Sequence, residues 1–352
     1  MAQVKRHWFS RLTFGTAALA VAALLVLSYA SALVNPARLW LFSLPGLLYI
    51  PLAVTALVFL IWSVRRRAPI GWILALTLLP SVSLAGRYLQ LRKPAEERGD
   101  IKIVSYNVGL FAHGNPDTPR LRTADSTAAW LRSLDADVIC LQEFYLPNSV
   151  SMDAWLRRAF PGYQADYYVL TGKNGHAGNV TLSRLRVENK GKMDFEKSTN
   201  LALYTDICFP GGVRRIYNCH FESYNISLSG LIKSMDEETA EDTGRKMRRS
   251  IRQRPRQVDA VLRDIGSSTC PALVVGDFND TPLSYTYHRL SRGRKDSFTV
   301  AGSGFGATYR EAWPLLRIDY LLFPQGMTVR SHETPKMPWS DHYPVLVTCD
   351  ES

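Results

Sequence analysis

Cysteine is scarce in this chain of 352 residues, and none of the five cysteines forms a Cys-x-x-Cys pair. Without close spacing, the cysteines indicate neither a zinc site nor a disulfide framework. Cys140 and Cys219 lie within apolar, strand-like runs, where cysteine acts as a small buried hydrophobic residue. The sequence also lacks internal repeats and low-complexity tracts.

Acidic residues are almost absent from the first 99 positions, where only Glu96 and Glu97 oppose eleven lysines and arginines. The whole chain has 42 basic and 31 acidic residues, so the remaining positions hold 31 and 29. Most of the net charge of +11 therefore belongs to the N-terminal region. Because the rest is nearly neutral, charge gives little support for a nucleic-acid-binding groove.

Three uncharged apolar runs occupy this N-terminal region: Phe14–Val34, Leu39–Val64 and Pro69–Ala85. The first two exceed the roughly 20 residues that a helix needs to cross a bilayer, and the third is shorter and contains Pro80. A signal peptide is the alternative for the first run, but no clear small-residue cleavage site follows it. We predict three transmembrane helices in residues 1–86 and a polar linker over 87–99.

The basic residues also predict an orientation. Bases cluster in Lys5–Arg11 and in Arg65–Arg67, whereas the intervening loop Asn35–Arg38 contains one. The positive-inside rule places both clusters in the cytoplasm, so three spans put everything after Gly86 outside it. The orientation reverses if the third run does not span. A compact three-helix tether favours a multi-pass protein of the bacterial inner (cytoplasmic) membrane with a periplasmic domain.

From Asp100 onward, short apolar runs alternate with stretches of helical spacing. Strands are predicted over Ile101–Asn107, Val138–Gln142, Leu201–Cys208, Arg215–Cys219, Ala272–Val275, Ile318–Phe323 and Val345–Val347. Helices are predicted over Ser126–Leu134, Asp153–Phe160 and Gln257–Ile265. This alternation predicts one α/β (α+β) domain over residues 100–352, with a layered core.

The segment Leu228–Arg256 is unusually charged. Acidic residues gather in Asp236–Asp242, and basic residues follow in Arg245–Arg256. We interpret the segment as a solvated helical excursion or a loop. A lid over a substrate is the alternative.

Polar residues with catalytic chemistry stand at the ends of the predicted strands. Loops at strand ends allow one scaffold to bring together side chains from distant parts of a chain. The residues in question are Asn107, Glu143, His220, Asp277, Asn279, Asp319, Asp341 and His342.

The order of three motifs, Gln142-Glu143, Gly276-Asp277-Phe278-Asn279 and Ser340-Asp341-His342, resembles the endonuclease/exonuclease/phosphatase superfamily of DNase I-like proteins. The resemblance covers residues 100–349. It implies a four-layered sandwich with two central, mostly antiparallel sheets. Loops at one end of the sheets would form the active site.

The same resemblance implies a metal site. Glu143 resembles the principal metal carboxylate, Asn107 the first-strand residue near the metal or phosphate, and Asp341 a residue near the metal. Carboxylate and amide oxygens suit a hard cation such as Mg²⁺, with Mn²⁺ as the alternative.

Roles in catalysis are carried over in the same way. Asp277 and Asn279 resemble the pair that orients and activates the attacking water. His342 resembles the histidine beside the scissile phosphate, and Asp319 the carboxylate that holds it. His220 matches a mid-chain histidine that contacts the phosphate. These residue types suit proton transfer near neutral pH.

Some positions depart from the pattern or lack an assigned role. Gly109 occupies the position where many nucleases of the superfamily carry an acid, which weakens the link to the abasic-site endonucleases. His176 and Asn179 receive no role. Tyr309 lies in a segment that resembles the family's substrate-side loop, where it could stack on a substrate or pack within the protein.

Together these features predict a membrane-anchored, divalent-metal-dependent hydrolase of phosphoester bonds. Its substrate would be a lipid headgroup or small molecule, or alternatively DNA or RNA. A third hypothesis is a non-catalytic membrane receptor or scaffold with the same fold. The bilayer is the expected partner of the N-terminal helices, and nothing in the sequence points to a protein partner.

Overall fold

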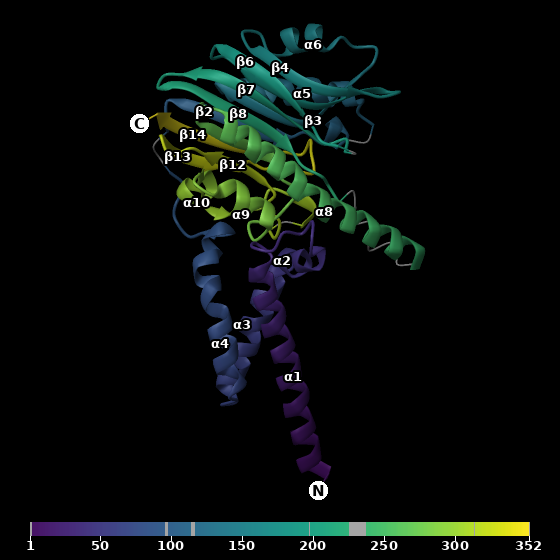
Figure 1. Ribbon diagram of the computed structural model, residues 1–352, viewed down its shortest axis with the longest axis vertical. Coiled ribbons are helices and arrows are strands. Elements are labelled where there is room, and N and C mark those ends of the chain that lie inside the picture. The colour runs from purple at the N-terminus through teal and green to yellow at the C-terminus, as the bar shows by residue number, and fades with distance from the viewer. Residues whose placement is uncertain are drawn as a thin grey trace.

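The computed structural model describes residues 2–95, 98–113, 117–196, 198–224, 237–312 and 314–351. Two six-stranded sheets form the centre of the larger domain (Figure 1). The first sheet has the order β13 (Met327–Glu333), β14 (Val345–Glu351), β2 (Ile101–Asn107), β3 (Val138–Pro147), β5 (Gly175–Ser183), β4 (Gln164–Thr171). The second has the order β10 (Lys295–Asp296), β12 (Asp319–Phe323), β9 (Ala272–Asp277), β8 (Gly212–His220), β7 (Leu201–Phe209), β6 (Val187–Asp194).

Each sheet contains one parallel pair. Strand β2 runs parallel to β3, and β8 runs parallel to β9. The other pairs in both sheets are antiparallel. The prediction of two mostly antiparallel sheets is therefore confirmed.

Helices cover the outer face of each sheet. Helices α5 (Arg120–Ser133) and α6 (Met152–Ala159) share a hydrophobic core with the first sheet, and α8 (Glu237–Ser267) and α9 (Tyr285–Ser291) share another with the second. A third core fills the space between the sheets. Strand β2 contributes side chains to the cores on both of its faces: Ile101 and Ile103 face the inter-sheet core, whereas Val104 and Tyr106 face the helices. The four-layered sandwich is confirmed.

The seven predicted strands are all present, and β2 has the predicted bounds. Several edge or short elements were not predicted, such as β4, β6, β13 and α10 (Ser297–Ala301). The helix predicted over Gln257–Ile265 is the C-terminal part of α8, which begins at Glu237. The charged segment is therefore helical from that residue onward, and its portion 228–236 lies outside the described residues.

The N-terminal region is helical. It contains α1 (Ala2–Ala30), η1 (Trp40–Phe42), α2 (Ser43–Leu47), α3 (Tyr49–Arg65), α4 (Ile70–Leu84) and η2 (Ala85–Arg87). By length and composition, Thr13–Ala30 and Ile70–Arg87 could each cross a membrane. The second apolar run is not one straight helix, because Trp40–Leu47 and Tyr49–Arg65 meet at a bend of 60°.

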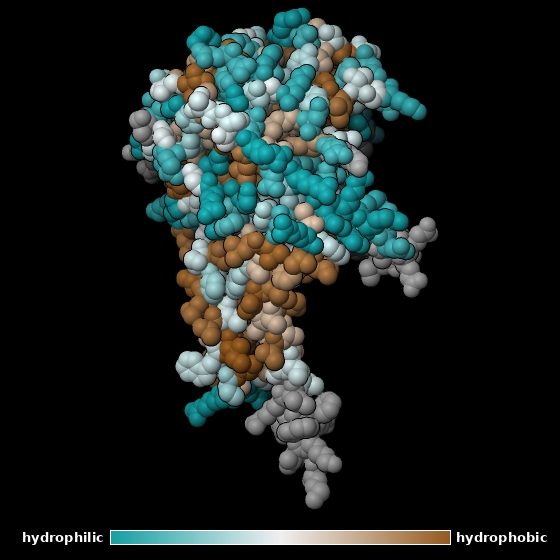
Figure 2. Space-filling view, in the orientation of Figure 1, coloured by the Kyte–Doolittle hydropathy of each residue, from teal (hydrophilic) through white to brown (hydrophobic). Residues whose placement is uncertain are grey.

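The outside of this helical bundle is apolar, whereas small residues such as Ala18, Ala22 and Ala56 pack inside it. On the face shown in Figure 2, a brown belt covers the helices below the mostly teal larger domain. Among the described residues, all but four of the exposed large hydrophobic side chains precede position 92; the exceptions are Leu170, Val300, Phe305 and Leu315. An apolar exterior of this kind is compatible with a membrane anchor.

The bundle contacts the larger domain in several places: the segment before α9, helix α8 through η1, and helix α10 through η2. The Ser31 hydroxyl donates to the Leu283 carbonyl (2.6 Å), and Arg87 donates to the Pro282 carbonyl (3.1 Å). Leu283 also packs in the hydrophobic core of the bundle. After the bundle, β1 (Leu89–Gln90) pairs with β11 (Gly304–Phe305), so the start of the predicted linker lies against the domain.

Candidate active site

The register of the strands brings the polar strand ends together. Asn107 on β2 is paired with Gln142 on β3, which places Glu143 one residue further along. In the second sheet, Asp277 on β9 is paired with both His220 on β8 and Asp319 on β12. Since the two parallel pairs end at the same edge of the sandwich, residues from distant parts of the sequence form one cluster.

A glycine allows β8 and β9 to approach each other just before Asp277. Gly276 has a φ of 124°, and a Cβ at this position would lie 2.1 Å from the Cys219 carbonyl oxygen. Only glycine adopts this backbone without strain and without that clash. Immediately afterwards, the Asn279 backbone N–H donates to Asp277 Oδ1 (2.8 Å), which orients the carboxylate.

Glu143 lies at an irregularity in β3, where the register against β5 shifts between Leu141 and Phe144. Its φ of 48° is in the left-handed region, which is uncommon for residues other than glycine. Bulges and strained residues of this kind often re-aim a side chain at a functional site.

Asn107 links the carboxylates of both sheets. Its amide nitrogen donates to Glu143 Oε1 (3.2 Å) and to Asp277 Oδ2 (2.9 Å). Its amide oxygen accepts from the Gly109 backbone N–H (3.0 Å), so the nitrogen faces the carboxylates. Asn107 therefore holds Glu143 and Asp277 together.

Two histidines border the same carboxylates. His342 Nδ1 lies 2.9 Å from Asp319 Oδ2, and His342 Nε2 lies 3.8 Å from Asp277 Oδ2. His220 Nε2 lies 3.4 Å from Glu143 Oε1 and 3.8 Å from Asp277 Oδ2. Burial alone would lower the pKa of His342, but Asp319 and Asp277 outweigh it and raise that pKa well above 6.5.

Asp277 has a raised pKa although two histidines lie beside its carboxylate. Burial, and then the charge of Asp319, raise the pKa of Asp277 to about 6 even though two histidines oppose the shift. Burial is the larger of the two causes. Strongly shifted acids of this kind are common where a site binds a cation or transfers a proton.

Asp341 lies on the other side of Asn107, next to a residue that the sequence analysis missed. The Ser340 hydroxyl donates to the Asn107 carbonyl (2.7 Å), which places Asp341 at the rim of the site. His113 Nδ1 lies 3.7 Å from Asp341 Oδ1. A Cβ on Gly109 would lie 2.7 Å from His113 Nδ1, so the missing acid at position 109 leaves room for this histidine. No spacing rule in the sequence points to His113.

Tyr309 packs against the site. Its ring meets the His342 ring edge-on, with centroids 5.3 Å apart, and the two residues form an isolated β-bridge. Its hydroxyl donates to Glu311 Oε2 (3.4 Å). Asn279 also belongs to the site, since its amide nitrogen donates to the Phe221 carbonyl (2.9 Å) and to Asp277 Oδ2 (3.3 Å).

Buried amides join the two sheets behind the site. Gln142 donates to Asn218 Oδ1 (2.8 Å), and Asn218 donates to the Val180 carbonyl (3.0 Å). Asn179 donates to the Asn218 carbonyl (3.1 Å) and thus acquires a structural role. His176 lies elsewhere, beside the Thr171 hydroxyl (2.9 Å).

The donors suit a hard divalent cation. One side-chain donor atom each of Asp277, Asp319 and His342 lie within 4.8 Å of one another, but these side chains are only 1–6% exposed. Glu143 and Asp341 are more accessible, at 30% and 22%. An exchangeable ion needs such access, and oxygen donors are those that Mg²⁺ prefers. The residues present therefore fit a divalent metal on the Glu143 side of the cluster.

Comparison with known proteins agrees with this geometry. Residues 104–342 match the model of the Endonuclease/Exonuclease/phosphatase family, and residues 10–88 match a "Domain of unknown function (DUF8431)". No curated protein matches the chain. The solved endonuclease/exonuclease/phosphatase from Beutenbergia cavernae DSM 12333 is 18% identical, with 72% of each chain covered and a TM-score of 0.55.

Two further solved structures share the fold. The endonuclease/exonuclease/phosphatase from Bacteroides vulgatus is 19% identical over 72% of this chain and 99% of that one, with a TM-score of 0.51. The human Nocturnin catalytic domain, solved with a bound sulfate anion, is 16% identical over 75% and 97%, with a TM-score of 0.53. At these identities the likeness concerns the fold alone.

Proposed function

The chain belongs to the Endonuclease/Exonuclease/phosphatase family, and from that membership we propose that it is a membrane-anchored, divalent-metal-dependent hydrolase of phosphoester bonds. Members of this family are generally hydrolases that act on phosphoester bonds. The observation that carries the proposal is the junction at Asn107, which holds Glu143 of one sheet and Asp277 of the other.

Glu143 and Asp341, with Asn107, would hold a Mg²⁺ or Mn²⁺ ion. A bound divalent cation neutralises charge on phosphate oxygens and on the leaving oxygen. The accessibility of the two carboxylates supports this choice over Asp319, whose Oδ2 is already occupied by His342. In the structure the Asn107 amide nitrogen faces the carboxylates, so the amide oxygen would bind the metal only after the side-chain amide had rotated by about half a turn.

The remaining residues would handle the water and the phosphate. Asp277, supported by Asn279, would orient the attacking water and accept its proton. His342 would donate a hydrogen bond to the phosphate, while Asp319 keeps its ring oriented. His220 would contact the same phosphate from the Glu143 side. Tyr309 would line the substrate side through its contact with His342.

The proposed organisation comprises a membrane anchor over residues 1–86, a linker over 87–99 and the catalytic domain over 100–352. Ribbons place the N-terminal end of α1 and the α3–α4 turn at the end of the bundle opposite the catalytic domain (Figure 1). The basic residues Arg65–Arg67 belong to that turn. With the positive-inside rule, this arrangement supports an inner-membrane protein with an extracytoplasmic catalytic domain.

The proposed substrate is a lipid headgroup or another small phosphoester. The apolar exterior of the bundle supports this choice, since it would hold the active site near a bilayer. The alternative is DNA or RNA, for which the nearly neutral net charge of residues 100–352 gives little support.

A hydrolysis assay of the full chain in detergent micelles tests the proposal. The panel contains bis-p-nitrophenyl phosphate, phospholipid vesicles, duplex and single-stranded DNA, and RNA, each with Mg²⁺ or with EDTA. We expect Mg²⁺-dependent hydrolysis that falls about 10²–10⁴-fold in Asp277→Asn and in His342→Ala. The control His176→Ala removes a histidine that lies away from the site and should keep full activity.

The pattern of turnover decides between the hypotheses. Preference for vesicles or the small diester supports the proposed substrate class, whereas preference for nucleic acid with strong salt sensitivity supports the nuclease alternative. Turnover that survives in Asp277→Asn would assign the activity to a contaminant. A folded chain without turnover on any substrate would favour the non-catalytic receptor or scaffold.

A further inference from the structure

Helix α8 carries a concentration of positive charge that the proposed catalytic chemistry does not use. Seven of the twelve residues in Arg245–Arg256 are lysine or arginine, and none is acidic. Arg254 is buried, and it pairs with Asp280 (2.9 Å). The other bases of this stretch are exposed on the helix: Arg245, Lys246, Arg248, Arg249, Arg252 and Arg256. We call these six residues the α8 basic face.

Helical spacing aligns the centre of this face. Arg245, Arg249, Arg252 and Arg256 follow one another at intervals of four, three and four residues, which is the period of one helix face. At 1.5 Å per residue, the stripe is about 17 Å long. The opposite face, with Ile251 as an example, is buried against the domain. The stripe therefore lies on the exposed side of α8.

One flank of the α8 basic face lies against the domain end of the helical bundle. The Arg248 guanidinium is 5.8 Å from the ring centroid of Trp40 in η1. Leu39 and Leu41 beside this tryptophan are 55% and 59% exposed. Tryptophan with exposed leucines is typical of the membrane–water interface. In Figure 2 the teal surface over α8 lies directly above the brown belt of the bundle.

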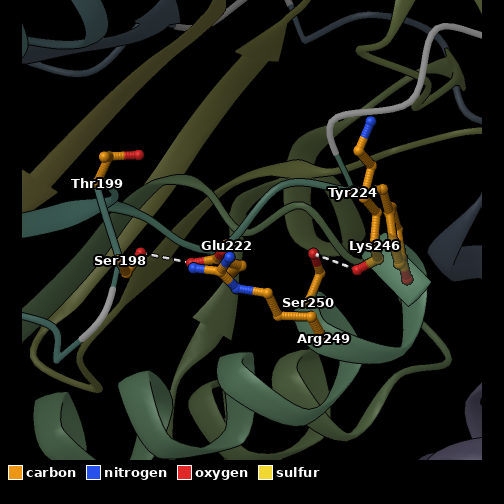
Figure 3. Close-up of a pocket in the computed structure, with 7 residues that line it drawn as sticks. All are labelled: Ser198, Thr199, Glu222, Tyr224, Lys246, Arg249 and Ser250. Carbon is orange, nitrogen blue, oxygen red and sulfur yellow. Dashed lines mark hydrogen bonds between the residues drawn. The ribbon is translucent and has the colours of Figure 1, made fainter. Parts of the chain in front are cut away.

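The other flank leads toward the active site. Lys246 and Arg249 line a pocket of about 490 Å³, together with Ser198, Glu222 and Tyr224. Figure 3 shows Arg249 reaching from the helix toward Ser198 and Glu222, with Lys246 beside Tyr224. Glu222 comes two residues after His220, so this pocket adjoins the strand end that carries a proposed catalytic histidine.

We propose that the α8 basic face binds the anionic phospholipid headgroups of the membrane that holds the bundle, and that it thereby seats the catalytic domain on that surface. The inference rests on the membrane anchor of the proposed function. An anionic bilayer attracts lysines and arginines that lie within about a Debye length of its surface. If η1 lies at the membrane interface, the α8 basic face beside it lies within that distance. A short stripe on the flank of the bundle suits this flat surface better than it suits a nucleic-acid backbone.

The test compares α8 in two lipid surroundings. The full chain is reconstituted in nanodiscs of dioleoylphosphatidylcholine alone, or with admixed dioleoylphosphatidylglycerol, and backbone hydrogen exchange of α8 is measured. Binding to the folded helix lowers its open population and slows exchange. We expect exchange within 245–256 to slow by roughly tenfold in the anionic discs.

Charge-matched variants identify the cause. The triple variant Arg245→Gln, Arg249→Gln, Arg252→Gln should lose the slowing, since glutamine keeps helix propensity and removes the charge. The control has three equivalent changes in the layer formed by α5 and α6, which Figure 1 places at the end farthest from the bundle, and should retain it. Its changes are Arg122→Gln, Arg157→Gln and Arg158→Gln.

Each alternative outcome is separable. If the chain is inserted and α8 exchanges at the same rate in both disc types, the proposal that the α8 basic face binds anionic lipid is wrong, and the membrane anchor is unaffected. Slowing caused by a short DNA duplex in phosphatidylcholine discs would assign the α8 basic face to nucleic acid instead. A chain that elutes apart from the discs overturns the anchor and this inference together. Hydrolysis of bis-p-nitrophenyl phosphate by the same samples reports separately on the proposed catalysis.

Discussion

Two buried carboxylates of the larger domain, Asp277 and Asp296, occupy opposite electrostatic surroundings. Burial would raise the pKa of Asp296, but Arg317 outweighs it and lowers that pKa below 3.8. Arg317 donates to both carboxylate oxygens, at 3.0 and 2.6 Å, and Tyr287 donates to one of them (2.7 Å). Asp277 instead lies near Asp319 and has its pKa raised to about 6.

The difference distinguishes a structural ion pair from a cluster of the kind that binds cations or transfers protons. Asp296 and Arg317 neutralise each other, and both are almost fully buried. Around Asp277, the carboxylates of Glu143 and Asp319 add negative charge that no arginine or lysine balances among the contacts of the described residues. The structural pair should therefore control stability, and the active-site cluster should control function.

The largest expected effect comes from breaking the structural pair. Arg317→Met leaves Asp296 buried without its counter-charge, which should destabilise the protein by about 3–5 kcal/mol. For a domain of this size, that loss lowers Tm by roughly 10 °C. In EDTA, Asp319→Asn should lower the free energy of unfolding much less than Arg317→Met does, because removing the Asp319 charge relieves its repulsion with Asp277. Thermal unfolding of both variants checks this, and equal losses would remove the distinction between the two regions.

A divalent cation should act on the active-site cluster only. At a concentration about 100 times its Kd, Mg²⁺ would stabilise the folded protein by about 2.7 kcal/mol, measured as a rise in Tm. Glu143→Gln removes a proposed metal carboxylate and should reduce this rise. Arg317→Met should show the same rise from its lower starting Tm. A rise that persists undiminished in Glu143→Gln would place the ion elsewhere.

The smallest expected effect is a difference in pH dependence. In EDTA, the unfolded Asp277 carboxyl ionises near pH 3.8 and the folded one at about 6, so its contribution to stability falls as pH rises between these values. Relative to Asp277→Asn, the wild type should lose about 2 kcal/mol over this range. Unfolding titrations at several pH values measure the slope.

For Asp296 the pH dependence of stability should have the opposite sign. Its folded pKa is lowered, so its stabilising contribution is present above pH 3.8 and is lost as the pH falls through the folded pKa. The stability difference between wild type and Asp296→Asn should therefore shrink only in acid. A decline between pH 4 and 6 for Asp296 would contradict the assigned pKa directions.

Much of the domain's secondary structure was predictable, because the buried strands are rich in branched and aromatic residues and short enough to recognise. Strands β2 and β9 are examples, since nearly all their side chains are buried. Strand β6 was missed because its sequence is mostly polar and its side chains are largely exposed. The bend at Leu48 within an apolar run was also missed, since hydrophobicity continues unchanged across it.

Parts of the candidate site were predictable only as a list of residues. Strand ends and motif order selected Asn107, Glu143, Asp277 and His342, and the structure brings these four together. His113 was not selected, because it reaches the site only through the space that Gly109 leaves beside Asp341. The buried amide of Asn179 likewise shows its role only when the two sheets are packed together.

Local patterns were enough to predict the apolar N-terminal runs, the alternating strands and the family motifs, because hydrophobic periodicity and residue type are local properties. Packing of distant segments established that Arg317 cancels the charge of Asp296 while Asp319 adds to that of Asp277. The same packing places the α8 basic face beside Trp40. Electrostatic energy depends on distances between side chains and on their burial, and both are established only when distant segments pack against each other.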